Sequence, residues 1–207
     1  MKQKLINLAE KYLSNEDPSH DINHALRVLS NAETIVEKEG GDLEIIWPAA
    51  LFHDIVNYPK NSPKSKYSSR DSAEVTEKIL RELDFYPTKK IPQVMTVIVE
   101  HSQSNGFKPS SLESKIIQDA DRLECTGAIA IMRTFCSSGQ MKRTFYNDHD
   151  LFCEERVPDK NNYAIDFFYD RLLMISEKMN TDTGKKIAKS RGEFLYLFLE
   201  QLKREIT

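Results

Sequence analysis

Cysteine is scarce in this chain, which has only Cys125, Cys136 and Cys153 among its 207 residues. An odd number of cysteines, none with the Cys-x-x-Cys spacing, argues against both a disulfide framework and a zinc site made of thiolates. We therefore expect a protein of the reducing cytoplasm.

Long hydrophobic runs and a strong net charge are also missing. No run approaches the roughly 18 apolar residues of a transmembrane helix. The charged fraction of 29% and the net charge of -3 describe an ordinary surface, without a general attraction to nucleic acid or anionic lipid. We expect no membrane or nucleic-acid partner, and any basic site must be local.

Alternation of apolar and polar residues between turn signals, which would indicate β-strands, is not found either, and helical periodicity dominates. The segments with helical spacing are Leu5–Leu13, Ala25–Val36, Leu43–Asp54, Arg70–Asp84, Ile91–His101, a segment beginning near Leu112, Ile165–Leu173 and Ile187–Leu202. Asp42 is a predicted N-cap, as is either Thr181 or Asp182. The expected fold class is all-α.

A chain of this length suits one domain with a sizeable core, so we expect a single domain over residues 1–207. From 137 to 162 the apolar spacing breaks down and Gly, Asn, Asp and Pro accumulate. Long loops in compact domains are often lids or binding loops, and this segment is predicted to be one.

His53 and Asp54 continue the apolar stripe of the third predicted helix, where polar residues are unexpected. The stripe consists of Leu43, Ile46, Trp47 and Ala50. A buried carboxylate costs several kcal/mol unless a partner compensates it, and a metal cation is among the strongest partners. The pair therefore predicts a buried cation site.

Other segments offer candidate ligands for the same cation. One face of the second predicted helix carries His20, His24, Arg27 and Asn31 at i, i+4, i+7 and i+11. Alone, such histidines are more often packing residues. The sixth segment adds Asp119 and Asp121, between which helical spacing does not decide. Convergence on a single cation would explain why three predicted helices all carry acids and imidazoles at inward positions.

These motifs resemble the HD-domain metal-dependent phosphohydrolases. The matching pieces occur in the order of that family and span nearly the whole chain: HDINHALRV, LFHD, EHSQS, QDADRLECTGAIAI and YAIDFFYDRLLMISEKMNTDTGKKIA. EHSQS and the final piece resemble a branch of small bacterial members that includes nucleotide pyrophosphohydrolase-like proteins. The resemblance implies a single-domain HD-type helical bundle.

The resemblance also implies that the metal ligands are His24, His53, Asp54 and Asp121. The residues expected to lie behind these ligands and orient them are His20, Asp21, Arg27 and Asp119. A mixed nitrogen and oxygen set suits one divalent Mn, Fe, Co, Ni, Mg or Zn ion. Four protein ligands leave room for water and substrate only in five- or six-coordination, which favours a catalytic site.

Asp54 and His101 are the predicted catalytic residues. His101 extends an apolar stripe and could protonate a leaving oxygen or bind phosphate; the alternative is a buried histidine at a helix end. Lys66, Arg70 and Arg122 are predicted to bind substrate phosphate, although Lys66 belongs with Lys60 and Lys64 to a basic loop that could simply be solvated. Arg122 could equally be a structural partner.

Departures from the family narrow the activity. Asn57 and Tyr58 stand where some HD enzymes acting on guanosine polyphosphates have an acidic pair, and too few histidines remain for a second metal ion. The leading hypothesis is a nucleoside triphosphate pyrophosphohydrolase-like enzyme with a phosphorylated small-molecule substrate. Alternatives are a nucleoside monophosphatase, a phosphodiesterase, and a metal-stabilised nucleotide-binding module without turnover.

Overall fold

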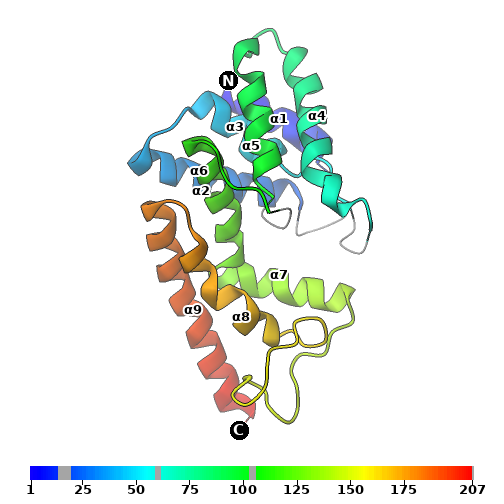
Figure 1. Ribbon diagram of the computed structural model, residues 1–207, viewed down its shortest axis with the longest axis vertical. Coiled ribbons are helices and arrows are strands. Elements are labelled where there is room, and N and C mark those ends of the chain that lie inside the picture. The colour runs from blue at the N-terminus through cyan, green and yellow to red at the C-terminus, as the bar shows by residue number, and fades with distance from the viewer. Residues whose placement is uncertain (14–19, 59–61, 103–105, 207) are drawn as a thin grey trace. The chain divides into compact units, whose positions relative to one another are not determined.

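The structure is a computed structural model that describes residues 1–13, 20–58, 62–102 and 106–206. Within these ranges it consists of α-helices, 3-10 helices and irregular segments, with one isolated bridge between Thr144 and Tyr163 and no β-strand (Figure 1). The all-α prediction is confirmed. Two compact units divide the chain, Met1–Asp121 and Arg122–Thr207. The single domain over 1–207 stays a prediction.

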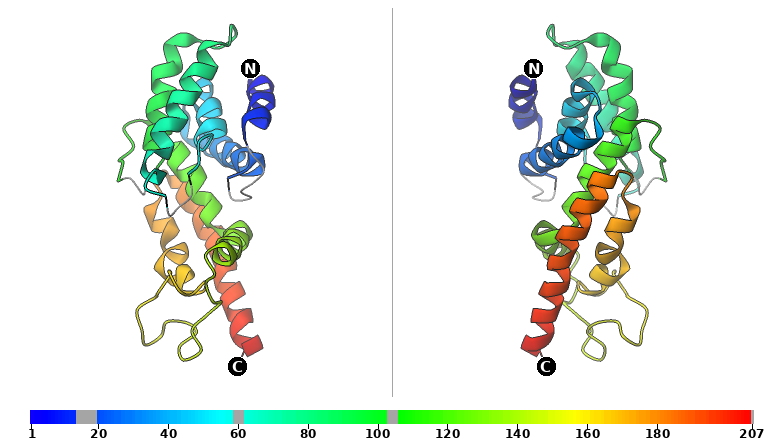
Figure 2. Two further views of the ribbon diagram at one scale, coloured as in Figure 1. Left: turned by 90° about the vertical axis from the view of Figure 1, so that its right-hand side faces the viewer. Right: turned by 90° about the vertical axis from the view of Figure 1, so that its left-hand side faces the viewer.

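The first unit is built from helices that pack in pairs. Its elements are α1 (Lys2–Tyr12), α2 (Ile22–Glu39), α3 (Leu43–Phe52), η1 (Ser65–Tyr67), α4 (Ser68–Arg81), η2 (Thr88–Lys90), α5 (Ile91–Glu100) and α6 (Leu112–Arg122), which ends at the unit boundary. Helices α4 and α5 lie side by side as a hairpin, and α2 packs against α3 (Figures 1 and 2). Asn31 of α2 donates to the Ala120 carbonyl of α6 at 3.2 Å.

Helix ends differ from the sequence prediction at the place that matters most. α3 stops at Phe52, so His53 is its C-cap and Asp54 lies in the turn that follows, not on the helix as expected. The Ile55 N–H bonds to the Phe52 carbonyl at 3.2 Å, which tightens the chain out of the α-helical pattern. α5 likewise ends at Glu100, with His101 as its C-cap.

Two predicted caps can be checked directly. The Asp42 side chain accepts a hydrogen bond from the Glu44 N–H at 2.9 Å, so the Asp42 N-cap is confirmed. Thr181 Oγ1 accepts from the Gly184 N–H at 3.0 Å, which selects Thr181 over Asp182 as the cap of the last helix.

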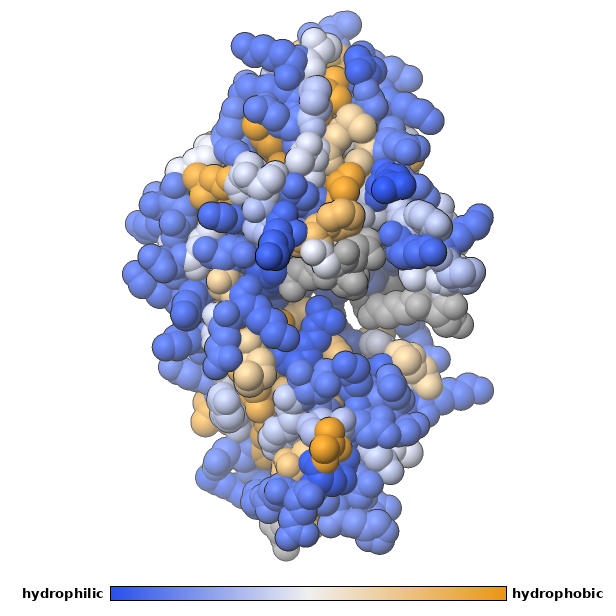
Figure 3. Space-filling model, viewed as in Figure 1, coloured by the Kyte–Doolittle hydropathy of each residue, from blue (hydrophilic) through white to orange (hydrophobic). Residues whose placement is uncertain are grey.

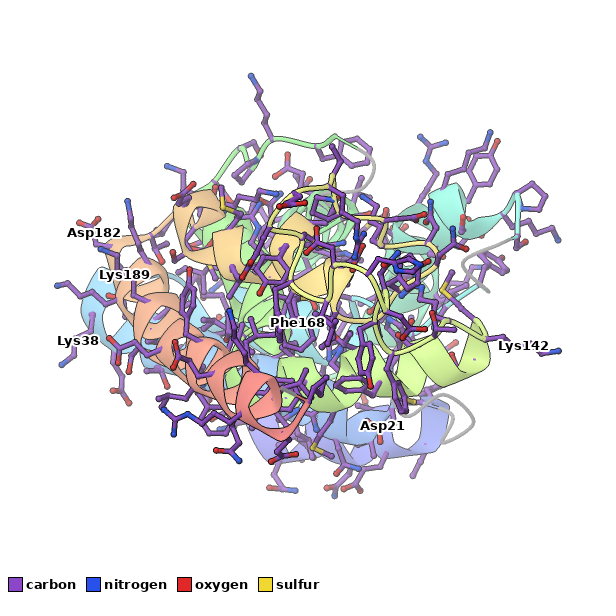
Figure 4. The ribbon with its side chains drawn as sticks, turned by 90° about the horizontal axis from the view of Figure 1, so that it is seen from below. Asp21, Lys38, Lys142, Phe168, Asp182 and Lys189 are labelled. Carbon is purple, nitrogen blue, oxygen red and sulfur yellow. The ribbon has the colours of Figure 1, made fainter. Side chains whose placement is uncertain are left out.

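The second unit surrounds an aromatic core. Its elements are η4 (Leu123–Cys125), α7 (Gly127–Gln140), α8 (Asp166–Asp170), η5 (Leu172–Lys178) and α9 (Asp182–Ile206). Phe168 of α8 is fully buried against residues of α7 and α9, and its ring stacks on Phe198 with centroids 5.6 Å apart (Figure 4).

The predicted irregular segment starts later than expected, because α7 continues through Gln140. Hydrogen bonds organise the part that follows. Asp166 is fully buried and accepts both guanidinium nitrogens of Arg156 and the Asp159 N–H at 2.6 Å. Asp150 accepts the N–H groups of Glu154 and Glu155. A role for this segment as a lid stays a prediction.

The surface is that of a mostly polar protein. The face in Figure 3 is largely hydrophilic, with hydrophobic residues in small separate patches. Among the described helices, none combines the length and apolarity needed to cross a bilayer.

We predict that Asp166→Ala lowers the free energy of unfolding by about 3 kcal/mol, because it leaves the Arg156 guanidinium and the Asp159 N–H without their buried acceptor. The matched control is Asp170→Ala, which removes a partly exposed carboxylate paired with Lys160 and should cost under about 1 kcal/mol. Urea denaturation measures both. Equal losses would show that the Asp166 network does not stabilise the fold.

Candidate metal centre

His24 enters the site from the first turn of α2. Asp21 is the N-cap of this helix, and its carboxylate accepts the His24 backbone N–H at 2.8 Å. The side chain of Asp21, which was expected behind the ligands, thus fixes the helix end that carries His24. The His24 side chain is 1% exposed.

Five side chains converge in the first unit and form what we call the His/Asp cluster: His24, His53, Asp54, His101 and Asp121. His24 Nε2 lies 3.1 Å from His53 Nε2 and 3.6 Å from Asp121 Oδ1. Asp54 Oδ2 lies 3.4 Å from His53 Nε2 and 3.7 Å from His24 Nε2. The two imidazoles thus have both expected carboxylate ligands, Asp54 and Asp121, within 4.0 Å.

His101 joins the cluster on the other side of the Asp54 carboxylate. Its Nε2 lies 3.4 Å from Asp54 Oδ1, and its ring makes an edge contact with His53, with centroids 4.9 Å apart. The two oxygens of Asp54 thus face different partners, Oδ2 toward His24 and His53 and Oδ1 toward His101.

Backbone carbonyls at two helix ends orient the imidazoles. His53 Nδ1 donates to the Ala50 carbonyl at 2.9 Å, and His101 Nδ1 donates to the Ile98 carbonyl at 2.6 Å. Because Nδ1 carries the hydrogen in each donor, Nε2 is the nitrogen that can bind a proton or a cation. In both residues this nitrogen points into the cluster.

The buried charges shift one another's pKa. Burial by itself lowers the pKa of His53, but the Asp54 and Asp121 carboxylates raise it to about 9. Burial by itself raises the pKa of Asp54, yet the charge of His53 and hydrogen bonds from His101 and His24 hold it well below its usual value. The pKa of Asp121 is lowered as well, since the charges of His53 and His24 outweigh its burial. The cluster therefore binds positive charge strongly.

The arrangement fits a divalent metal ion. Ligand atoms about 2.1 Å from one ion lie about 3.0 Å apart at right angles and about 4.2 Å apart when opposite. The separations of His24 and His53 from each other and from the Asp54 and Asp121 oxygens run from 3.1 to 4.0 Å. Two groups of three offer donor atoms within 4.8 Å of one another, His24 with His53 and Asp121, and His53 with Asp54 and His101. Imidazole and carboxylate donors suit the metals expected from the sequence.

Asp119 and Asp121 lie in different surroundings. Asp121 points its carboxylate at His24 and His53, whereas Asp119 is fully buried on the same helix. His20 Nε2 lies 4.0 Å from Asp54 Oδ2, and its ring contacts His24 edge-on. The ligand assignment itself, and the supporting roles of Arg27 and Asp119, stay predictions.

Gln118 is a positioning residue that the sequence did not reveal. Its amide donates to the Glu100 carbonyl at 2.6 Å and to the Phe107 carbonyl at 3.3 Å. It thereby ties α6 to the end of α5, one residue before His101. No periodicity signal distinguishes such a glutamine from any other buried polar residue.

The predicted substrate-binding cations lie in different surroundings. Lys66 and Arg70 are exposed at the start of α4, while Arg122 is 9% exposed and donates to the Lys178 carbonyl at 2.6 Å. That contact favours the structural alternative for Arg122. Lys60 lies outside the described residues. Binding of substrate by Lys66, Arg70 or Arg122 stays a prediction.

Comparison with known proteins identifies the family. The HD domain model matches residues 21–126, which contain the whole His/Asp cluster. YpgQ of Bacillus subtilis, an uncharacterised protein, is 32% identical over 203 residues, which are 95% of this chain and 89% of YpgQ. The chain belongs to the HD domain family, and the resemblance expected from the motifs is confirmed.

Solved structures agree over the full length. The crystal structure of YpgQ in complex with ADP is similar with a TM-score of 0.73 and 27% identity, covering 99% of this chain and 94% of that chain. An HD-superfamily hydrolase from Bacillus thuringiensis gives a TM-score of 0.72 and 28% identity, with coverages of 99% and 95%. The fold is therefore that of the HD-superfamily hydrolases.

We predict that metal binding releases about one proton at pH 7.5. The pKa of His53 is raised to about 9, so the metal-free protein holds a proton there that a cation must displace. Below pH 9, affinity should rise roughly tenfold per pH unit, since each unit removes tenfold of the competing proton. Titration calorimetry with Mn²⁺ in two buffers of different ionisation enthalpy counts the released protons. Heat that is independent of the buffer would contradict this expectation.

A pair of variants tests the choice of aspartate on α6. Asp121→Ala should lower the affinity for Mn²⁺ at least about 100-fold, because it removes a carboxylate 3.6 Å from His24 Nε2. Asp119→Asn, which conserves volume, should change that affinity less than about tenfold. Circular dichroism of both variants checks that the helices remain. The reverse order of effects would assign Asp119 as the ligand.

Proposed function

We propose that this protein is a metal-dependent phosphohydrolase that cleaves a nucleoside triphosphate to the monophosphate and pyrophosphate. The observation that carries the proposal is the meeting of His24 and His53 with the Asp54 and Asp121 carboxylates, with 3.1–4.0 Å between the two imidazoles and from them to the carboxylate oxygens. The HD-superfamily hydrolase fold supports hydrolysis as the reaction class. A divalent ion held by these four residues would activate a water molecule and polarise a phosphoryl oxygen.

The remaining chemistry falls to His101 and Asp54. The Ile98 carbonyl accepts the Nδ1–H of His101, so its Nε2 faces the cluster and, when it carries a proton, can donate that proton to the departing pyrophosphate oxygen. Asp54 Oδ1, 3.4 Å from this nitrogen, orients the ring. In this proposal His101 replaces the lost proton from solvent after each turnover.

Nucleotides are the proposed substrates for two reasons. The relative YpgQ has been crystallised in complex with ADP. In this chain, exposed cations at Lys66 and Arg70 follow the segment that carries Asp54, and polyphosphate needs such partners. A monophosphatase would release inorganic phosphate, whereas a binding module would release nothing.

The test is to incubate the Mn²⁺-loaded protein with a panel of nucleoside mono-, di- and triphosphates and to identify the phosphate product. Pyrophosphate from triphosphates is expected, whereas orthophosphate or no product would contradict the proposal. Asp54→Ala should lower kcat at least about 1,000-fold, because it removes a ligand and the partner of His101. Asp84→Ala, at an exposed aspartate beyond α4, is the matched control and should leave kcat unchanged.

A further inference from the structure

A pocket of about 240 Å³ opens in the first unit, separate from the donor atoms of the His/Asp cluster. Its lining comes from η1, the start of α4, the end of α5 and the segment before α6, and consists of Lys66, Tyr67, Ser69, Arg70, Val99 and Phe107. The pocket thus combines two cations, two hydroxyls and two aromatic rings.

The hydroxyl of Ser69 is the first sign of a ligand. The residue is only 3% exposed, yet within the described ranges its hydroxyl has no hydrogen-bond partner, and it lines the pocket. The hydroxyl is therefore available to a bound acceptor atom in the pocket.

The cations are the second sign. Arg70 forms no ion pair with any carboxylate in the described part of the chain, and the nearby Asp71 accepts from the Tyr58 hydroxyl at 2.8 Å. Lys66 Nζ lies 5.0 Å from the centre of the Tyr67 ring. Arg70 stands in the first turn of α4 and Lys66 in η1 just before it, and the helix dipole disfavours positive charge at such a helix start. Positive side chains at this helix start go against the local charge preference, and such exceptions are typical of sites that bind a ligand.

The aromatic rings supply the third sign. Tyr67 and Phe107 are 44% and 39% exposed, and together with Val99 they leave an apolar wall open beside the cations. Stacking of a nucleobase on such a ring contributes about 1–3 kcal/mol. A phosphate alone would not use this wall.

Hydrogen bonds connect the pocket to the segment that carries Asp54. The Ser72 hydroxyl of α4 bonds to both the N–H and the carbonyl of Val56, two residues after Asp54, at 3.1 and 3.2 Å. Ser68 Oγ accepts from the Tyr58 N–H at 3.4 Å. On α5, Val99 precedes His101 by two residues. The same pieces of backbone therefore hold both the cluster and the pocket.

We propose that this pocket binds a nucleoside phosphate, with a phosphate oxygen on Arg70, Lys66 and the Ser69 hydroxyl and the base against Phe107. The inference deepens the proposed function and rests on it in one respect, namely that the ligand is the nucleotide substrate. It assigns binding roles to Ser69 and Phe107, which no sequence motif indicated, and limits the substrate to phosphates that carry an aromatic base.

Binding to the Mn²⁺-loaded protein tests the pocket without turnover. The probes are the ADP analogue with a methylene bridge, adenosine, and methylenediphosphonate. Arg70→Ala should weaken the ADP analogue and methylenediphosphonate about tenfold and leave adenosine unchanged, because only the first two carry phosphoryl charge. Phe107→Ala should weaken the ADP analogue and adenosine about fivefold and leave methylenediphosphonate unchanged.

Two further variants control for charge and for folding. Arg81→Ala removes an exposed, ion-paired cation at the other end of α4 and should leave all three affinities unchanged. Ser69→Ala should weaken the ADP analogue about threefold without lowering the melting temperature, because the hydroxyl has no partner within the described chain to lose. A purely structural role for Ser69 would give the opposite pattern.

ADP-analogue affinities within twofold of the native value in both Arg70→Ala and Phe107→Ala would overturn the inference. So would equal weakening in Arg70→Ala and Arg81→Ala, which would indicate a general charge effect. Failure of the proposed function gives a different result. If the protein binds the probes in the expected pattern but releases no pyrophosphate, the pocket assignment stands and only the proposed reaction is wrong.

Discussion

The crowding of two partly buried carboxylates beside three buried imidazoles is the constraint on which the first unit depends. Asp54 and Asp121 repel each other, and a positive charge beside them offsets that repulsion. In the metal-free protein that charge is a proton on His53, whose pKa rises to about 9. A divalent cation meets the same requirement with more charge and with directional bonds. Proton and metal are therefore competitors for one place.

Helix ends, not helix faces, deliver the three histidines of the His/Asp cluster. His24 lies in the first turn of α2 behind the Asp21 cap, whereas His53 and His101 are the C-caps of α3 and α5. The last carbonyls of a helix have no partner within it. The carbonyls of Ala50 and Ile98 accept the Nδ1–H of His53 and His101. The same hydrogen bonds that satisfy these terminal carbonyls therefore also point the two imidazoles into the cluster.

Helical periodicity and burial cost pointed to a cation near His53 and Asp54, and the family motifs supplied the order of the remaining residues. Periodicity did not separate Asp119 from Asp121, because both spacings suit a helix and only the packing of α6 turns one carboxylate toward His24. Periodicity also wrongly predicted that Asp54 lies on α3, because the apolar stripe gives no sign of the tight turn after Phe52. The partners of Gln118 and the isolation of the Ser69 hydroxyl depend on distant segments, which no local pattern encodes.

The position of the ligands at helix ends also governs how a cation enters and leaves. Terminal turns fray at a free-energy cost far below that of global unfolding. Opening the last turn of α3 or α5 would swing His53 or His101 aside while the remaining helix stays packed. A cation held by the cluster would then exchange through local opening of one helix end, without unfolding of the whole unit.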